Sequence, residues 1–270
     1  METAELLHYQ QRLLESDSLI IVVSQSGQSA EIVALADAVR GRAPLIALTN
    51  TSASPLASSA DVVLHMHAGP EATVACKTYV CSLLVLEWLG ALLTGQDAAT
   101  VREELSHAAP AVERYLAHWR EHVASLAEQL VPVRRIFITG RGRSLAAAEN
   151  GGLILKEAMR FHAEGMSCPA FRHGPFEVLR DEVLVIVMAG DSRTASQNRR
   201  LADDITRAGG RAAVVDSQDA APRFLIPESS ERVRPILEIL PVQMITLALG
   251  VIGGRQPGSF ALNTKVTTTE

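Results

Sequence analysis

Small hydroxyl and amide side chains follow the apolar run 18–24, in the stretch SQSGQS. Its polar side chains surround Gly27, and four of them are candidates for binding a ligand: Ser24, Gln25, Ser26 and Ser29. Serine hydroxyls can donate hydrogen bonds to an anion, and a glycine lets the backbone approach it closely. A helix that begins directly after the stretch would add unpaired N–H groups and a partial positive charge. These residue types therefore predict a phosphate-binding loop.

Other roles for such a loop remain open on the residues alone. Serine caps helix N-termini routinely, so residues 24–29 could have a purely structural role. The nucleotide P-loop is excluded, because no Gly-Lys-Ser/Thr follows. A second loop of the same kind, TGRGRS at 139–144, lacks the third glycine and the later acidic residue of a dinucleotide site. We therefore expect no dinucleotide there.

Three other residues have side chains suited to moving protons or polarising a carbonyl: Glu157, His173 and Lys265. A carboxylate can act as a base and then as an acid, and histidine titrates near neutral pH. A lysine can polarise a carbonyl or form a Schiff base with it. Their local sequences also fit structural roles, namely an exposed helix position, a loop residue before Gly-Pro and a solvated charge in the tail.

The elements that must position these residues are short apolar runs alternating with helical patterns. The predicted strands are 18–24, 44–50, 61–67, 134–140, 182–190 and 211–217. Helices are predicted at 3–15 and 29–41 and from about Thr73, with one or two connecting helices at 100–130. Strands that are apolar throughout and alternate with helices are typical of an α/β fold with a parallel sheet covered on both faces. In such folds ligands bind beyond the carboxyl ends of strands, where the loop 24–29 is expected to lie.

Composition limits the partners and the compartment. The chain has 270 residues and a net charge of −5 without a basic patch, so we expect no nucleic-acid partner. Three scattered cysteines suit a reducing cytoplasm, and neither they nor the strand residues His65 and His67 form a pattern typical of a metal site. The N-terminal segment is polar, unlike a secretory signal. The most apolar runs, 79–93 and 236–252, each contain a glutamate and are predicted to be buried helices rather than membrane spans.

The two halves of the chain repeat one another. Residues 19–50 and 183–217 share the order strand, short loop with serine, helix, glycine and strand. In the second half this unit follows another strand–loop–helix unit, at 134–165, whereas the first half opens with the helix 3–15 alone. We therefore expect the first domain to lack its opening strand, loop and helix, through a misplaced start, a shortened chain or a natural short variant. A paired strand before Ser18 would contradict this.

In combination, these residues resemble the sugar isomerase (SIS) family, in the double-domain form of the isomerase half of glucosamine-6-phosphate synthase and related deaminases. The matching segments are SQSGQSAEIVALADA, TNTSASPLASSADVVL, AGPEATVACKTY, GRGRSLAAAENGGLILKEAMRFHAEG, FRHGPFEVL and NTKVTTTE. The most specific combination is LKEAMRFHAEG followed by RHGP. The resemblance implies two SIS domains, each a flavodoxin-like three-layer sandwich. We expect the first, N-terminally incomplete and with its connecting helices, at 1–128, and the second, with the C-terminal tail, at 129–270.

The resemblance also implies roles for individual residues. The loop residues Ser24, Gln25, Ser26 and Ser29 would hold the phosphate of a hexose 6-phosphate, and Val74 and Ala75 would line the sugar pocket. Glu157 would move a proton between C1 and C2 of the sugar. His173 would help to open the sugar ring and would reach the site from the partner subunit of a homodimer. Lys265 would contact the carbonyl of the open-chain sugar.

Some features depart from the family pattern. Relatives of the synthase type have a lysine where this chain has Ile154, and no glutaminase domain is present in the sequence, so we expect no glutamine-dependent synthesis. The segment VACKTY is one residue shorter than is usual, and the serine of the first domain's opening loop is absent with its strand. The missing lysine and the missing glutaminase domain favour a deaminase or a simple isomerase over the synthase, whereas the short first domain favours a sensor or an inactive fragment.

Two functions remain open. The first is a cytoplasmic, homodimeric phosphosugar isomerase acting on a hexose 6-phosphate or amino-hexose 6-phosphate, with deamination of glucosamine 6-phosphate as one form of the reaction. It would need no cofactor, metal, membrane or nucleic acid. The alternative is a non-catalytic sensor or regulator that binds a sugar phosphate. The presence of Glu157, His173 and Lys265 together favours the enzyme, because a sensor has no use for a base.

Overall fold

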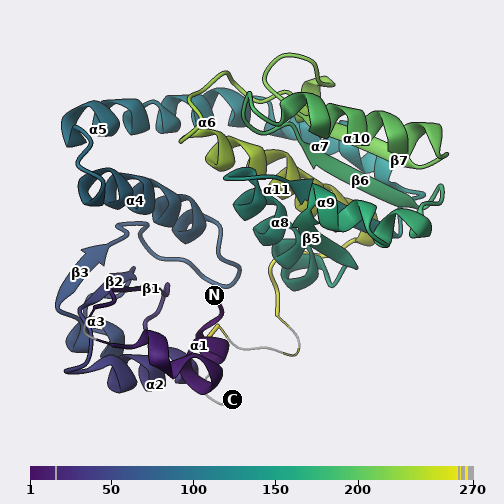
Figure 1. Cartoon of the computed structure of the whole chain (residues 1–270). Coiled ribbons are helices and arrows are strands. Elements are labelled where there is room, and N and C mark those ends of the chain that lie inside the picture. Colours follow the sequence, from purple (N-terminus) through teal and green to yellow (C-terminus); the bar gives the residue numbers. More distant parts are fainter. Residues whose placement is uncertain (16, 261, 263–264, 267–270) are drawn as a thin grey trace. The chain divides into compact units, whose positions relative to one another are not determined.

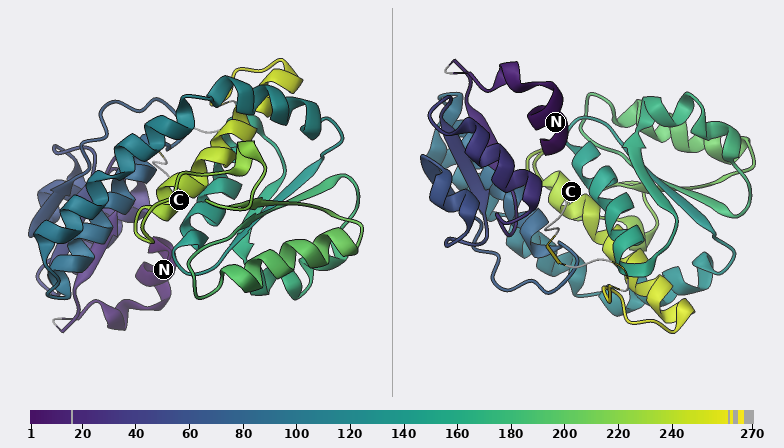
Figure 2. Two further views of the ribbon diagram at one scale, coloured as in Figure 1. Left: turned by 90° about the horizontal axis from the view of Figure 1, so that it is seen from above. Right: turned by 90° about the horizontal axis from the view of Figure 1, so that it is seen from below.

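The computed structural model describes residues 1–15, 17–260, 262 and 265–266. The chain divides into two compact units (Figure 1), which we call the first unit, Met1–Leu89 with Phe260–Glu270, and the second unit, Gly90–Ser259. Each unit contains one parallel β-sheet with helices packed on it, as Figure 1 and Figure 2 show. The predicted α/β class is confirmed.

The first unit has a three-stranded parallel sheet in the order β1-β2-β3. The strands are β1 (Ile20–Val23), β2 (Leu45–Thr49) and β3 (Val62–His65), and all three lie within predicted runs. The connections are α2 (Ala30–Val39) and the short α3 (Pro55–Ser59), which was not predicted. α4 (Lys77–Leu93) follows β3 and begins four residues later than predicted. Because the strands are parallel, the loops after β1, β2 and β3 lie at one edge of the sheet.

The segment before β1 differs from the single predicted helix 3–15. It forms α1 (Thr3–Tyr9) and the 3-10 turn η1 (Gln11–Leu13), because Gln10 leaves the helical region at φ −125° and ψ 29°. Ahead of β1, residues 1–15 and 17–19 form no strand. Within the described residues β1 pairs with β2 alone, whereas its repeat counterpart in the second unit, β6, pairs on both sides. The shortened first domain stays a prediction.

The second unit has a four-stranded parallel sheet in the order β5-β4-β6-β7. The strands are β4 (Arg135–Gly140), β5 (Ala163–Ser167), β6 (Val183–Met188) and β7 (Arg211–Val215). The helices α8 (Ser144–Met159) and α11 (Arg234–Gly253) pack on one another, and α8 packs on β4 and β5. On the other face lie α9 (Cys168–Arg172) and α10 (Ala195–Arg207), which share a core with alternate residues of β6, Val183, Val185 and Val187. Figure 2 shows the resulting three layers.

Two parts of the second unit differ from prediction. Strand β5 was missed because its sequence, AEGMS, has no β-branched residue and contains glycine. The connecting region forms three helices, α5 (Ala98–Ser106), α6 (Ala108–Leu116) and α7 (Trp119–Leu130), rather than one or two. The break after α5 follows from Pro110, which has no N–H to donate to the carbonyl of Ser106. Short 3-10 turns, η2 (Pro175–Val178) and η3 (Pro222–Phe224), complete the unit.

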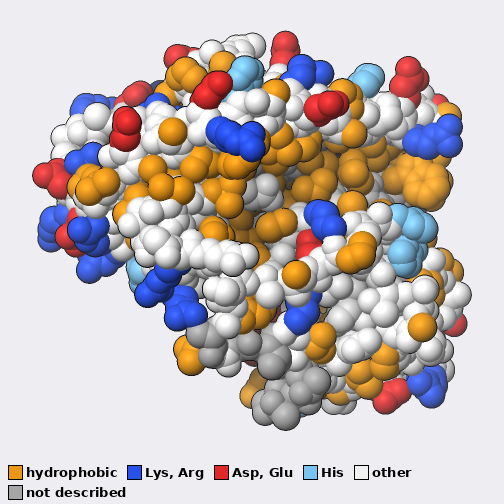
Figure 3. All heavy atoms as spheres, turned by 180° about the vertical axis from the view of Figure 1, so that it is seen from behind, with side chains coloured by type: hydrophobic (Ala, Val, Ile, Leu, Met, Phe, Trp, Pro, Cys, Tyr) orange, Lys and Arg blue, Asp and Glu red, His pale blue; other side chains and the backbone are white. Residues whose placement is uncertain are grey.

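The two most apolar runs have different surroundings. α11 is long and apolar enough to cross a membrane, but 72% of its apolar window is buried within the protein, as predicted for a core helix. α4 is less buried than predicted: Leu89 and Ala91 are buried, whereas Leu92 and Leu93 are 48% and 54% exposed. Figure 3 shows apolar side chains gathered over a broad part of one molecular face. Apolar surface of this kind is typical of interaction sites.

The compact units differ from the predicted division at 128/129 in two respects. α5, α6 and α7 belong to the second unit, because α6 and α7 pack against α11. Phe260 and the described residues after it belong to the first unit, where Lys265 makes its contacts. The boundary at 128/129 therefore remains a prediction for the domains of the family rather than a division between packed units.

Candidate functional site

The loop between β1 and α2 holds its serines in a tight turn. The amide of Gly27 donates to Ser24 Oγ at 3.1 Å, and the amide of Gln28 donates to Ser26 Oγ at 3.3 Å. A hydroxyl that accepts in this way can still donate its own hydrogen to a ligand. Ser29 is the N-cap residue of α2, yet its side chain makes no capping hydrogen bond. The side chain of Ser29 therefore does not cap α2, and its role in binding a phosphate stays a prediction.

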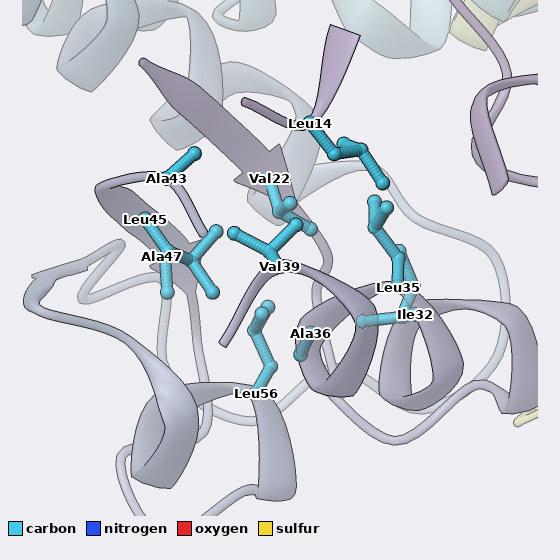
Figure 4. Close-up of a cluster of buried hydrophobic side chains, with 10 residues drawn as sticks. All are labelled: Leu14, Val22, Ile32, Leu35, Ala36, Val39, Ala43, Leu45, Ala47 and Leu56. Atoms are coloured by element: carbon cyan, nitrogen blue, oxygen red, sulfur yellow. The ribbon is translucent and has the colours of Figure 1, made fainter. Parts of the chain in front are cut away.

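Gly27 is required by the shape of the loop. Its φ is +63°, and a Cβ added there would lie 2.3 Å from Ser54 Oγ. Ser54 is fully buried and caps α3 by accepting from the amide of Ala57, so it has no room to move away. Below the loop lies the core of the first unit, in which side chains of α2 meet Val22 and Leu45 (Figure 4). The loop is therefore supported by packed structure on its inner side.

Asn50, directly after β2, connects the loop between β1 and α2, which we call the serine loop, to the segment after β3. Its amide donates to the carbonyl of Gln25 at 3.1 Å. Its side chain donates to the carbonyl of Gly69 at 2.9 Å and accepts from the amide of Ala68 at 3.0 Å. Sequence reasoning missed this residue, although its place at the end of a predicted strand was a usable signal. Asn50 thus joins the loops after all three strands of the first unit.

The segment after β3 is organised by Glu71, which sequence reasoning also missed. Its Oε1 accepts from the amides of Cys76, Lys77 and Thr78, and its Oε2 accepts from the hydroxyl of Thr78. Burial of the side chain opposes ionisation, but these hydrogen bonds together outweigh it and hold the pKa of Glu71 below its usual value. A single buried carboxylate therefore caps the start of α4.

The residues expected to line the sugar pocket lie within this segment. Val74 and Ala75 are half-buried and are spanned by the bonds between Glu71 and the start of α4. Lys265 reaches the same segment from the C-terminal tail. Its Nζ donates to the carbonyl of Thr73 and lies 3.9 Å from Glu71 Oε2. The fold thus brings Lys265 to residues 73–75, which we call the pocket segment after the role expected of Val74 and Ala75; that Lys265 contacts a sugar carbonyl stays a prediction.

Glu157 lies in the second unit, near the end of α8. Small residues allow this helix to lie directly on the sheet: a Cβ at Gly152 would lie 2.3 Å from the amide nitrogen of Gly165. Glu157 is half-buried, one residue before the buried Ala158 and Met159. Its position is therefore fixed by a helix whose distance from the sheet cannot change freely.

Two neighbouring positions bear on the predicted chemistry. Ile154, which stands where synthase-type relatives have a lysine, is only 2% exposed and packs as an apolar core residue. His173 follows α9 and is exposed, and the residue after it, Gly174, has a φ of +142°. An exposed imidazole fits the expectation that His173 acts at the site of a partner subunit, which stays a prediction.

The histidines of β3 make only local contacts. The rings of His65 and His67 are 4.3 Å apart, and the amide of His67 donates to His65 Nδ1 at 3.1 Å. Among the described residues, no group of three or more histidine, cysteine or acidic side chains could hold a metal ion. These contacts account for both residues structurally.

The second unit has a buried acid near the carboxyl ends of its strands. Glu238 of α11 is fully buried, and burial raises its pKa to about 7, against the opposing effects of the nearby Ser144 hydroxyl and the charge of Arg234. Among the described residues, neither carboxyl oxygen of Glu238 has a hydrogen-bond partner. A separate cavity of about 700 Å³ lies against α6 and α7 in this unit and is lined by Tyr115, His122 and Arg223, among others. The predicted site residues are not among those lining it.

Comparison with known proteins identifies the family of the chain. The family model for the SIS domain matches residues 1–92 and 129–223, which is more than half of the chain. Glutamine–fructose-6-phosphate aminotransferase (isomerizing) from Thermococcus kodakarensis is 31% identical over 286 residues, covering 100% of this chain and 47% of that relative. The enzyme of the same name from Zymomonas mobilis is 29% identical, and the match covers 98% of this chain and 47% of that relative. The chain thus spans about half the length of these curated relatives.

Solved structures agree with this fold. A candidate phosphosugar isomerase from Silicibacter pomeroyi is 28% identical, with a TM-score of 0.77, over 95% of this chain and 78% of that one. Glucosamine-6-phosphate deaminase from Thermotoga maritima has a TM-score of 0.80 over 99% of this chain and 80% of that one, and its 20% identity shows the fold alone. From the match of the family model to most of the chain, and from these relatives, the chain belongs to the SIS-domain family.

Proposed function

We propose that this protein is a phosphosugar isomerase that interconverts the aldose and ketose forms of a hexose 6-phosphate or amino-hexose 6-phosphate. The observation that supports this most is the arrangement of the first unit. There, Asn50 joins the serine loop to the segment after β3, and Lys265 contacts that segment. Binding an open-chain sugar phosphate requires a loop that binds the phosphate and a cation that contacts the carbonyl.

In this proposal the phosphate is bound by Ser24, Gln25, Ser26 and Ser29, with the amides at the start of α2. Val74 and Ala75 line the sugar pocket, and Lys265 polarises the carbonyl. Glu157 carries the proton between C1 and C2, and His173 from the partner subunit of a homodimer assists ring opening. The exposed apolar side chains of α4 support a partner subunit, and the odd number and scattered places of the three cysteines in the sequence support a reducing, cytoplasmic compartment.

The test is turnover of the full chain with a panel of hexose 6-phosphates and amino-hexose 6-phosphates. Deamination would convert glucosamine 6-phosphate and water to fructose 6-phosphate and ammonia, and each product can be assayed separately. We expect at least one sugar phosphate to be converted and to raise the melting temperature of the protein by mass action. A melting-temperature increase without turnover of any member of the panel would contradict an enzyme and favour the sensor.

The substitution Glu157→Gln separates the two functions. It keeps the size of the side chain but removes the base, so kcat should fall by roughly 10²- to 10⁴-fold while the affinity for the sugar phosphate stays nearly unchanged. Calorimetric titration with the best ligand of the panel measures affinity, and product formation measures kcat. The matched control is Glu177→Gln, an exposed position of the same unit. A Glu157→Gln protein as active as this control would contradict the assigned role of Glu157.

A further inference from the structure

Glu71 lies where the pocket segment, the start of α4 and the C-terminal tail meet. Its side chain is only 4% exposed, whereas most glutamates of soluble proteins are largely solvated. A buried carboxylate is costly unless it is hydrogen-bonded or paired with a cation. Glu71 has both kinds of partner, because one oxygen accepts from backbone amides and the other faces Thr78 and Lys265.

The two oxygens divide these contacts. Oε1 accepts from the amides of Cys76 at 2.9 Å and Lys77 at 2.6 Å, which satisfies donors that a helix start leaves unpaired. Oε2 is the oxygen closest to Lys265 Nζ, at 3.9 Å. The cap needs only an acceptor, whereas the contact with Lys265 depends on negative charge. The cap and the contact with the tail are therefore separable by substitution.

Lys265 is held at two points by this segment. Its Nζ donates to the carbonyl of Thr73, and the negative charge of Glu71 lies beside it. The side chain of Lys265 is 27% exposed, so part of it remains accessible from solvent. Thr73 directly precedes Val74 and Ala75, so the contacts that hold the amine also fix its distance from the expected pocket lining.

We infer that Glu71 is a positioning residue, which holds the amine of Lys265 against the pocket segment and sets where that amine meets the substrate carbonyl. This role rests on the proposed function of Lys265. Glu71 itself is turned toward amides and the lysine, so it acts on the substrate through Lys265. Misplacement of a reacting group by about 1 Å can reduce a rate a hundredfold, which gives such an anchor a kinetic effect.

The first test measures the lysine itself and needs no activity. The sequence contains three lysines, Lys77, Lys156 and Lys265, so acetylation of each is readily followed by peptide mass spectrometry. In Glu71→Gln the glutamine carbonyl still accepts from the amides, but the charge is lost. We expect Lys265 to be acetylated severalfold faster in this variant than in the wild type, whereas the exposed Lys156 of the second unit keeps its rate.

The second test measures turnover of the best sugar phosphate. In Glu71→Gln we expect kcat to fall by about ten- to a hundredfold with little change in sugar-phosphate affinity, because the serine loop is untouched. Adding Glu71→Gln to Lys265→Met should have little further effect, since both changes remove one contact. Glu71→Asp keeps the charge and should recover part of the lost kcat. The surface change Glu5→Gln in α1 is the control.

The outcomes separate this inference from the proposed function. An inactive wild type would contradict the proposed isomerase, and the acetylation rates would still report whether Glu71 holds Lys265. Unchanged acetylation of Lys265 in Glu71→Gln would overturn the inference, whatever the activity. The inference would also be overturned if Glu71→Gln and Glu71→Asp lost ligand affinity and melting temperature to the same extent, without a selective loss of kcat. Glu71 would then be only a cap of α4.

Discussion

Single residues decide whether the serine loop can form. Gly27 has a left-handed backbone conformation and lies against a buried serine, Ser54, so it meets two constraints at once. Gly41, shortly after α2, also has a positive φ, of +73°, but a Cβ added there would meet no atom within 4 Å. The two glycines therefore separate the effect of backbone conformation from that of close packing.

Substitution of each glycine by alanine measures this difference. Gly41→Ala should destabilise the protein by about 1–2 kcal/mol, the usual cost of a left-handed L-residue. Gly27→Ala should cost roughly 1–3 kcal/mol more, because the added methyl group overlaps Ser54, and it should weaken binding of the sugar phosphate. Urea unfolding gives the stabilities. Equal free energies of unfolding for the two variants would contradict the close packing at Gly27.

At the scale of elements, α8 carries Glu157 and is placed by small residues. Gly151 faces Ile138 and Val242, while Gly152 faces the backbone of Glu164 and Gly165 on β5. A backbone atom cannot rotate away as a side chain can, so an added methyl group at Gly152 must push α8 and β5 apart. The proposed base thus depends on two glycines that precede it by more than a helical turn.

Gly152→Ala is therefore expected to destabilise the protein by about 1–3 kcal/mol or more and to lower kcat through displacement of Glu157. The control is Gly90→Ala in α4, where an added Cβ meets nothing within 4 Å. In a helix with open space, alanine should instead stabilise by about 0.5–1 kcal/mol. Thermal unfolding of the two variants should show shifts of opposite sign, and a shift to higher temperature for Gly152→Ala would contradict this packing.

At the scale of the whole molecule, stability should depend on pH through a buried acid. The pKa of Glu238 in the folded protein is raised to about 7 by burial, from 4.5 in the unfolded chain. A raised pKa contributes stability that is fully present below pH 4.5 and is lost as the pH rises through about 7. Above pH 7 the folded second unit must hold a buried carboxylate.

We expect the wild type to lose on the order of 3 kcal/mol of stability between pH 5 and pH 8 relative to Glu238→Gln, which cannot ionise there. Denaturant unfolding at several pH values measures both proteins, and Glu177→Gln serves as an exposed control. A constant difference between wild type and Glu238→Gln over this range would show that Glu238 does not titrate with a raised pKa.

Much of the fold could be predicted from the sequence, because apolar runs and helical periodicity are local properties. All six predicted strands are present, and the serine loop lies at the carboxyl end of β1 as expected. Strand β5 could not be recognised, since AEGMS has little strand propensity and forms a strand only because β4 pairs with it. The break at His107 was predictable in principle from Pro110 but was not predicted.

The sequence alone determined the class of the fold, the serine loop and the residue types suited to sugar-phosphate chemistry, since these depend on neighbours along the chain. Only the tertiary structure revealed the roles of Asn50 and Glu71. Asn50 contacts the segments that follow two other strands. Glu71 contacts a lysine 194 positions later in the chain. The contacts of Asn50 arise because parallel strands bring their loops to one edge of the sheet, and that of Glu71 arises because the tail folds back onto the first unit. No local pattern encodes which of these side chains meet.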